Sequence, residues 1–269
     1  MAAGEGKDEM DRSGISGRVA VVTGAAHGIG TAVVHALGEL GATVVAIDLD
    51  ADELAEVAST ATGKGRRVLA CPADVADSAA VESAVEHAER EAGPVDLLVN
   101  VAGILHPGTV QEIDEADWHR TFAVNTTGVF HLCRSVSKRM IPRGRGSIVT
   151  VGSNAAGVPR QGMAAYGASK AAATLFTKSL GLELAEHGIR CNVVSPGSTD
   201  TPMQHRLWDE RGPVPVIAGS LETYKTGIPL GKLATAEDVA EAVVFLLSDQ
   251  AGHITMHDLY VDGGATLRA

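Results

Sequence analysis

Short apolar, β-branched runs alternate with longer segments of helical periodicity along most of the chain. Runs in which nearly every position is apolar predict strands that are buried on both faces, and such strands form parallel sheets covered by helices. The pattern therefore predicts an α/β fold built on one doubly wound parallel sheet. Strands are expected at 18–23, 43–47, 68–72, 95–99, 147–151, 190–194 and 259–261, and helices at 29–40, 78–92, 114–140, 164–186 and 237–247.

The segment 198–231 interrupts this alternation. It contains four prolines and four glycines but no long apolar run. It follows a predicted strand, and ligands of open α/β sheets bind beyond the carboxyl ends of the strands. We interpret it as a substrate-binding insertion within a single domain; a plain surface excursion is the alternative.

The charge balance disfavours two classes of partner. With 22 Lys and Arg residues against 33 Asp and Glu residues, the formal net charge is −11. Nucleic acids and anionic membrane surfaces are bound through basic patches, so neither is expected as a partner. The densest basic cluster, Arg143 to Arg145 with Lys138 and Arg139 nearby, has no aromatic residues for base stacking, and we interpret it as a solvated helix end.

Residues 1–14 are polar and mixed in charge. They lack the apolar core of a signal peptide, so a disordered tail is predicted at 1–14 and a single domain at 15–269. No apolar run approaches the length of a membrane span, and a cytoplasmic location is expected. The three cysteines and ten histidines show no ligand spacing, so neither a metal site nor a disulfide framework is predicted.

Tyr166 and Lys170 lie four residues apart in a predicted helix, so their side chains share one helical face. A free tyrosine has a pKa of about 10, and a nearby cation favours the phenolate. Tyr166 is therefore a candidate general base, with Lys170 as the cation that lowers its pKa. The same spacing is also typical of a packed tyrosine beside a solvated amine on a surface helix.

A glycine-rich turn, Gly24 to Gly30, separates the first predicted strand from the first helix. Its GxxxGxG spacing lets the backbone approach a pyrophosphate, whose charge then meets the helix N-terminus. Asp48 follows the second strand, where a carboxylate can accept hydrogen bonds from the ribose hydroxyls of NAD and repel the phosphate of NADP. No Arg or Lys adjoins it, so a Rossmann fold that binds NAD is predicted; a helix-capping aspartate is the alternative.

Several motifs resemble, in order and spacing, those of the short-chain dehydrogenase/reductase family. The resemblance extends from Ser16 to the C-terminus and rests on Thr23-Gly24 to Gly28-Ile29-Gly30, Asn100-Val101-Ala102-Gly103, Asn125, Ser153, Tyr166 with Lys170, and Pro196-Gly197. It implies that NAD is bound by Gly24, His27, Gly28, Ile29, Gly30, Asp48, Asp74, Val75, Asn100, Ala102, Gly103, Tyr166, Lys170, Pro196, Gly197 and Thr199.

The resemblance also implies the roles of four catalytic residues. Tyr166, as phenolate, takes the proton of a substrate hydroxyl while hydride moves to the nicotinamide. Lys170 lowers the pKa of the phenol and holds the nicotinamide ribose, and Ser153 orients the reacting oxygen. Asn125 holds a water that passes the proton to solvent. Taken alone, Ser153 is interpreted as a helix cap and Asn125 as a solvated helix residue.

Longer segments, at 100–105, 121–125, 157–160, 190–199, 228–230 and 252–257, resemble NAD-dependent dehydrogenases of 2,3-dihydro-2,3-dihydroxybenzoate from siderophore pathways. These enzymes oxidise one ring alcohol, and the ketone tautomerises to the catechol 2,3-dihydroxybenzoate. Such a substrate carries a carboxylate, which requires a cation or several donors. Arg160 is the first candidate for that contact. The other expected substrate residues are His106, Ser153, Met163, Gln204 and Trp208, with Arg206 as a weaker candidate.

The chain departs from that pattern at His106, where those enzymes typically have an arginine. The change is compatible with a neutral loop variation or with a related ring acid, the 2-amino analogue 2,3-dihydro-3-hydroxyanthranilate, whose oxidation gives 3-hydroxyanthranilate in an antibiotic pathway. Two further hypotheses are an NADPH-dependent ketoacyl reductase, which Asp48 disfavours, and a non-catalytic dinucleotide-binding scaffold, which the complete catalytic set disfavours. A homotetramer is expected from the resemblance alone.

Overall fold

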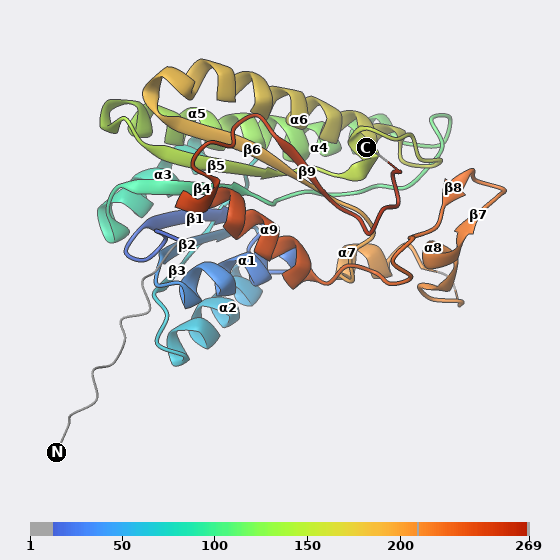
Figure 1. The fold of residues 1–269 in the computed structure, drawn as a ribbon, viewed down its shortest axis with the longest axis horizontal. Helices are drawn as coiled ribbons and strands as arrows, with labels where there is room; N and C mark the ends of the chain where they lie inside the picture. Colours follow the sequence, from blue (N-terminus) through green and yellow to red (C-terminus); the bar gives the residue numbers. More distant parts are fainter. Residues whose placement is uncertain (1–12, 209, 268–269) are drawn as a thin grey trace.

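The computed structural model describes residues 13–208 and 210–267, which fold around one seven-stranded sheet (Figure 1). The strands are β1 (Val19–Thr23), β2 (Thr43–Asp48), β3 (Val68–Pro72), β4 (Val95–Asn100), β5 (Gly146–Val151), β6 (Ile189–Pro196) and β9 (Asp258–Val261). They are ordered β3-β2-β1-β4-β5-β6-β9, and every neighbouring pair is parallel. This confirms the predicted doubly wound sheet.

Helices cover both faces of the sheet (Figure 1). The layer on one face consists of α1 (Gly28–Glu39), α2 (Ala51–Gly63) and α9 (Ala236–Leu247). The layer on the other face contains α3 (Ser78–Ala92), α4 (Glu115–Phe122), α5 (Gly128–Met140) and α6 (Ala164–Leu184). The strands between them are apolar because each must bury both faces: every residue of β1 and β4 is buried. Among the helices described, none is long and apolar enough to cross a membrane.

Helix α2 was absent from the sequence-based prediction. Only Leu54, Val57 and Ala61 of this helix are buried, so its apolar stripe is narrow. Its start is nevertheless encoded locally, because the Asp50 carboxylate accepts a hydrogen bond from the Glu53 N–H at 3.2 Å. An N-cap of this kind satisfies a backbone donor that the helix leaves unpaired.

The single helix predicted at 114–140 is divided in the structure. A π-helical segment at Ala123–Thr127 separates α4 from α5. Such segments are rare and occur frequently at functional sites. Here the π-helical turn carries Asn125, which is fully buried rather than solvated. Short 3-10 helices lie at Ile141–Arg143, Asn154–Ala156, Ala185–His187 and Asp249–Ala251.

The strand order reverses between β1 and β4, and the loops that follow these strands diverge to leave a crevice at their carboxyl ends. The predicted insertion lies beyond that edge (Figure 1). It contains α7 (Pro202–His205), α8 (Val214–Ala218) and an antiparallel hairpin of β7 (Gly219–Ser220) and β8 (Lys225–Thr226). It is therefore a small folded unit rather than one long irregular loop.

Two observations refine the expected surface and tail. Residues 1–12 of the predicted tail lie outside the described residues, whereas Ser13 is buried and its carbonyl accepts a hydrogen bond from the Asp249 N–H at 2.8 Å. The interpretation of the basic cluster as solvated holds for Lys138 and Arg145, which are exposed, but is wrong for the other two cations. Arg139 and Arg143 are largely buried and form ion pairs with Glu89 of α3 at 3.5 and 3.0 Å. The cluster therefore joins α3 to α5.

We expect Arg143→Met to lower the free energy of unfolding by about 1–3 kcal/mol, because Glu89 and the Val95 carbonyl each lose a charge-assisted hydrogen bond in a shielded position. The matched control is Arg90→Met, whose ion pair with Glu91 is exposed; it should cost less than about 0.5 kcal/mol. Urea unfolding of both variants measures the difference, and equal losses would contradict the structural role of Arg143.

Candidate active site

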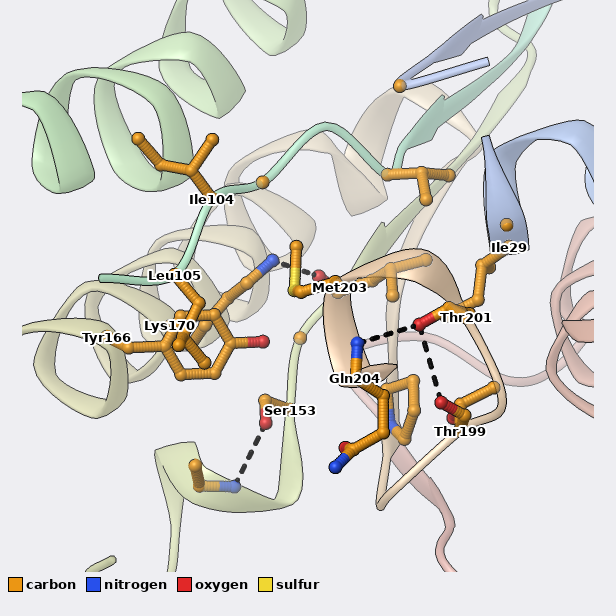
Figure 2. Close-up of a pocket in the computed structure, with 18 of the residues that line it drawn as sticks. Ile29, Ile104, Leu105, Ser153, Tyr166, Lys170, Thr199, Thr201, Met203 and Gln204 are labelled. Carbon is orange, nitrogen blue, oxygen red and sulfur yellow. Dashed lines mark hydrogen bonds between the residues drawn. The ribbon is translucent and has the colours of Figure 1, made fainter. Parts of the chain in front are cut away.

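A cavity of about 660 Å³ opens at the carboxyl ends of the strands (Figure 2). Among the residues predicted for the cofactor and substrate, those that line it are Gly24, His27, Gly28, Ile29, Asp48, Asp74, Val75, Ala102, Gly103, Ser153, Arg160, Met163, Tyr166, Lys170, Pro196, Gly197, Thr199, Gln204 and the weaker candidate Arg206. Side chains from distant parts of the sequence therefore meet in one space. Gly30, Asn100, His106, Asn125 and Trp208 lie outside its lining.

Tyr166 and Lys170 project from α6 into this cavity (Figure 2). The Lys170 side chain is 4% exposed, and its ammonium donates a hydrogen bond to the Val151 carbonyl at 2.9 Å, at the end of β5. Its nitrogen lies 6.0 Å from the centroid of the Tyr166 ring. Lys170 is thus not the solvated amine of the alternative interpretation. It is a buried cation that links α6 to the sheet.

Burial shifts the pKa values of both groups toward their neutral forms. It raises the pKa of the Tyr166 phenol, against the opposing effect of the Ser153 hydroxyl. It lowers the pKa of Lys170 from 10.5 to about 8. The expectation that Lys170 lowers the pKa of Tyr166 is therefore not met in the protein alone. The physical reason is that desolvation of the phenolate outweighs the hydrogen bond from Ser153, while the Lys170 ammonium is directed at the Val151 carbonyl.

Ser153 begins a single 3-10 turn after β5, and its hydroxyl faces that of Tyr166 (Figure 2). The hydroxyl accepts a hydrogen bond from the Ala155 N–H at 3.1 Å, so the capping interpretation holds as well. A hydroxyl can accept one hydrogen bond and donate another. Ser153 can therefore cap the turn and still donate to an oxygen placed between it and Tyr166.

Asn125 positions the loop that forms one wall of the site. Its side chain accepts from the Ile104 N–H at 2.8 Å and donates to the Ile104 carbonyl at 2.9 Å and to the Ser169 hydroxyl at 3.0 Å. The fit around Gly103 is close, because a Cβ there would lie 3.1 Å from the Lys170 ammonium nitrogen. Asn125 therefore joins α4–α5, α6 and the loop after β4 beside the catalytic pair.

The glycine turn after β1 has the shape that a pyrophosphate requires. A Cβ on Gly30 would lie 1.9 Å from the Gly24 carbonyl oxygen, and one on Gly24 would lie 2.7 Å from the Ala102 nitrogen. Gly24 and Gly28 also have positive φ angles of 65° and 53°. The N-cap residue of α1, His27, makes no side-chain cap, and the first turn has no acidic residue. The unpaired N–H groups of this helix end are therefore suited to an anion.

Asp48 lies at the other end of the dinucleotide region. Its two carboxylate oxygens accept hydrogen bonds from the Ala26 N–H at 3.0 Å and the Asp50 N–H at 3.1 Å. These bonds fix the carboxylate at the cavity edge while each oxygen retains acceptor capacity for a ribose hydroxyl. The arrangement fits a nicotinamide dinucleotide, with the glycine turn at the pyrophosphate and Asp48 at the adenine-side ribose.

Two charged residues of the cavity lining were missed by the sequence-based prediction. Arg120 of α4 donates to a single carboxylate oxygen of Asp74 through both terminal nitrogens, each at 3.1 Å. Lys225 of β8 lines the cavity together with Arg160. Neither residue belongs to a motif, and although the insertion at 198–231 was predicted to bind substrate, nothing in the sequence singled out Lys225 within it.

Two of the expected substrate residues are placed elsewhere. His106 is hydrogen-bonded to the Thr121 hydroxyl at 3.2 Å and lies 3.8 Å from the Asp117 carboxylate. Trp208 packs against the His205 ring, with centroids 4.3 Å apart. Asn100, expected at the cofactor, donates instead to the Thr150 hydroxyl at 3.3 Å inside the sheet. No group of three or more metal-ligating side chains occurs within residues 13–208 and 210–267.

The comparisons with known proteins agree with this arrangement. The family model described as enoyl-(acyl carrier protein) reductase matches residues 24–266. The crystal structure of gox2181 superposes with a TM-score of 0.89 at 33% identity, covering 96% of this chain and 99% of that chain. The chain belongs to the short-chain dehydrogenase/reductase family and is an oxidoreductase. Dehydrogenases of this family use a nicotinamide dinucleotide.

More specific relatives share most of the chain. The 2,3-dihydro-2,3-dihydroxybenzoate dehydrogenase of Bacillus subtilis is 60% identical over 259 residues, which cover 96% of this chain and 99% of that protein. The vibriobactin-specific 2,3-dihydro-2,3-dihydroxybenzoate dehydrogenase of Vibrio cholerae is 45% identical over 259 residues, with coverage of 96% and 98%. Both similarities extend through the insertion as well as the sheet.

The depressed pKa of Lys170 predicts a pH-dependent stability. Because the folded pKa of about 8 lies below the ordinary 10.5, the unfolded chain binds more protons between these values, and stability rises with pH across that window. Relative to Lys170→Met, the wild type should gain about 2–3 kcal/mol between pH 8 and pH 10.5. Urea unfolding without added dinucleotide, at both pH values, measures this gain. A difference that does not change with pH would contradict the buried ammonium.

Proposed function

We propose that the protein oxidises one ring alcohol of 2,3-dihydro-2,3-dihydroxybenzoate with NAD and forms the catechol 2,3-dihydroxybenzoate, in a siderophore-type pathway. The observation that carries this proposal is the meeting of Tyr166 and Ser153 with Arg160 in one cavity. The first two residues suit a reacting alcohol, and the third suits the carboxylate of the same ring. The named relatives, which share the insertion as well as the sheet, support the same substrate.

The side chains divide the work of the oxidation. A nicotinamide dinucleotide, when bound, would supply the hydride acceptor for this oxidation and a positive charge in the cavity. Tyr166 takes the hydroxyl proton, and Ser153 donates a hydrogen bond to the same oxygen as its charge develops. Lys170, with a pKa of about 8, is suited both to holding ribose hydroxyls and to relaying a proton. The resulting ring ketone loses its remaining sp³ hydrogen by tautomerisation, and aromatisation makes the sequence strongly favourable.

Asp48 supports NAD rather than NADP. Its fixed carboxylate lines the cavity, and none of the described Lys or Arg residues forms an ion pair with it. A phosphate on that ribose would meet an anion that two backbone N–H groups hold in place. The repulsion between the NADP phosphate and Asp48 lowers NADP affinity more than a mobile side chain would, because the Asp48 carboxylate cannot turn away.

The structure removes the main support for the amino analogue. That alternative rested on His106 standing where the resembling dehydrogenases have an arginine. His106 does not line the cavity and is hydrogen-bonded to Thr121. The change is therefore compatible with a loop variation that leaves the ring acid unaltered, and the dihydroxy acid is the favoured substrate.

The function is tested by incubating the protein with NAD and the dihydroxy diene acid. We expect NADH absorbance to rise in step with catechol formation, measured by chromatography. Tyr166→Phe should lower kcat by about 10²- to 10⁴-fold, because the proton acceptor is lost while the ring still fills its place. NAD affinity of the variant, measured by calorimetry, should be nearly unchanged. Absence of turnover by the wild type would exclude this function, and full activity of the variant would exclude Tyr166 as the base.

Cofactor choice is tested at Asp48. Asp48→Ala should reduce the preference for NAD over NADP by about 10- to 100-fold in kcat/KM, because the ribose loses charge-assisted hydrogen bonds and the phosphate loses a repelling anion. Asp50→Ala is the matched control: it removes the same charge two residues away, where the carboxylate caps α2. If both variants shift the preference equally, the effect is one of general charge and not of Asp48 as a ribose ligand.

A further inference from the structure

Two cations share the substrate end of the cavity. Arg160 comes from the loop before α6, and Lys225 comes from β8 in the insertion, 65 residues further along the chain. Both are half-buried. Across residues 13–208 and 210–267, neither side chain has a hydrogen bond or an ion pair within 4.0 Å. Buried charges are normally paired, so two adjacent cations without a partner require an explanation.

Asp262 supplies part of the missing charge, but only from a distance. Its carboxylate raises the pKa of Arg160, against the stronger lowering effect of burial. It forms no ion pair with Arg160 within 4.0 Å, and its oxygens accept hydrogen bonds from the Gly264 N–H at 3.0 Å and from the Thr266 N–H and hydroxyl at 3.0 and 2.8 Å. The two cations also act against each other: burial and the charge of Arg160 both lower the pKa of Lys225. An anion bound between them would relieve both costs.

The backbone holds Lys225 in place. The hairpin pairs Ser220 with Lys225 and Gly219 with Thr226. The Thr226 hydroxyl donates to the Ala265 carbonyl at 2.8 Å, which ties β8 to the C-terminal segment. Gly219 has a φ angle of 85°, and a Cβ on it would lie 2.5 Å from the Gly227 nitrogen. The turn at 221–224 is exposed, but Lys225 lies at the base of the hairpin, where strand pairing and close backbone packing hold its main chain.

We propose that Lys225 and Arg160 form a two-cation clamp for the ring carboxylate, and that this clamp selects ring acids with a net negative charge over zwitterionic ones. The inference rests on the proposed function, because it takes a ring carboxylate as the ligand. It adds Lys225 as a residue that determines specificity, and it gives a physical reason why anionic ring acids are preferred over zwitterionic ones. The occupant is an anionic cyclohexadiene carboxylate.

The selection follows from charge. In the amino analogue, an ammonium on the ring carbon next to the one that bears the carboxylate stands close to whatever binds that carboxylate. With two cations there, the ammonium adds a third positive charge to a partly desolvated space, where repulsion is stronger than in water. A hydroxyl at the same position carries no charge and can accept a hydrogen bond from either cation.

The first test removes the charge of Lys225. Lys225→Met should raise KM for the dihydroxy diene acid by about 10- to 100-fold with kcat within about threefold, because ground state and transition state both hold the carboxylate. Lys225→Arg should keep KM within about threefold of the wild type. Lys232→Met, an exposed lysine outside the cavity lining, is the matched control and should change neither constant. An unchanged KM in Lys225→Met overturns the clamp.

The second test measures selectivity. The ratio of kcat/KM for the dihydroxy acid to that for the amino analogue should fall by about tenfold or more in Lys225→Met, because the repulsion of the ammonium is relieved. A merely structural role for Lys225 predicts equal losses for both substrates and an unchanged ratio, which would overturn the charge selection. Lys225→Gln serves as a second neutral variant, and NAD affinity and thermal melting show that each variant is folded.

Product binding separates this inference from the proposed function. Calorimetry with 2,3-dihydroxybenzoate and NAD measures the affinity of the wild type and of Lys225→Met. A wild type that turns over the diene acid, with product affinity and KM independent of Lys225, retains the function and overturns the clamp. A wild type that oxidises neither diene, yet binds the product about 10-fold or more tightly through Lys225, retains the clamp and overturns the reaction. If the wild type neither oxidises a diene acid nor binds the product through Lys225, both the proposed function and the clamp are overturned.

Discussion

The burial of Lys170 is the constraint on which the rest of the active site depends. Its ammonium leaves water to donate to the Val151 carbonyl, and in doing so it fixes α6 against the end of β5. Tyr166, one turn earlier on the same helix, is positioned by that attachment. A side chain at Gly103 would crowd the ammonium, because its Cβ would lie 3.1 Å from the nitrogen. The loop after β4, the helix and the sheet therefore meet at one desolvated charge.

Burying the Lys170 ammonium costs desolvation free energy, and Lys225 carries a similar cost at the other end of the site. Lys170 has a pKa of about 8, and Lys225 also has a lowered pKa beside Arg160. A structure optimised only for stability would pair these cations or expose them. Here they face a cavity, where a dinucleotide and a ring acid would supply the compensating oxygens and negative charge. Unlike Arg120, which is paired with Asp74 in the same cavity, Lys170 and Lys225 form no ion pair with the described residues, and the folded state is less stable than such pairs would make it.

The fold could be predicted almost entirely from the chain. Apolar runs long enough to be buried on both faces identified all seven strands of the sheet, and helical periodicity identified the helices with a broad apolar stripe. Helix α2 was missed because only three of its residues are buried. The π-helical segment around Asn125 was missed because one extra residue in a helical turn changes no periodicity that a short window can resolve. The motif residues, from Gly24 to Thr199, could be named because their spacing is characteristic.

The sequence by itself determined the sheet, the glycine turn, the acidic residue after β2 and the Tyr/Lys spacing, because each depends on residues that are neighbours in the chain. The tertiary structure decided the pKa values, which depend on burial: Tyr166 is made less acidic and Lys170 more so. It also moved His106 out of the cavity lining and brought Lys225 in. Those outcomes depend on contacts between residues far apart in the chain. The β7–β8 hairpin that carries Lys225 was not predicted by any local sequence pattern.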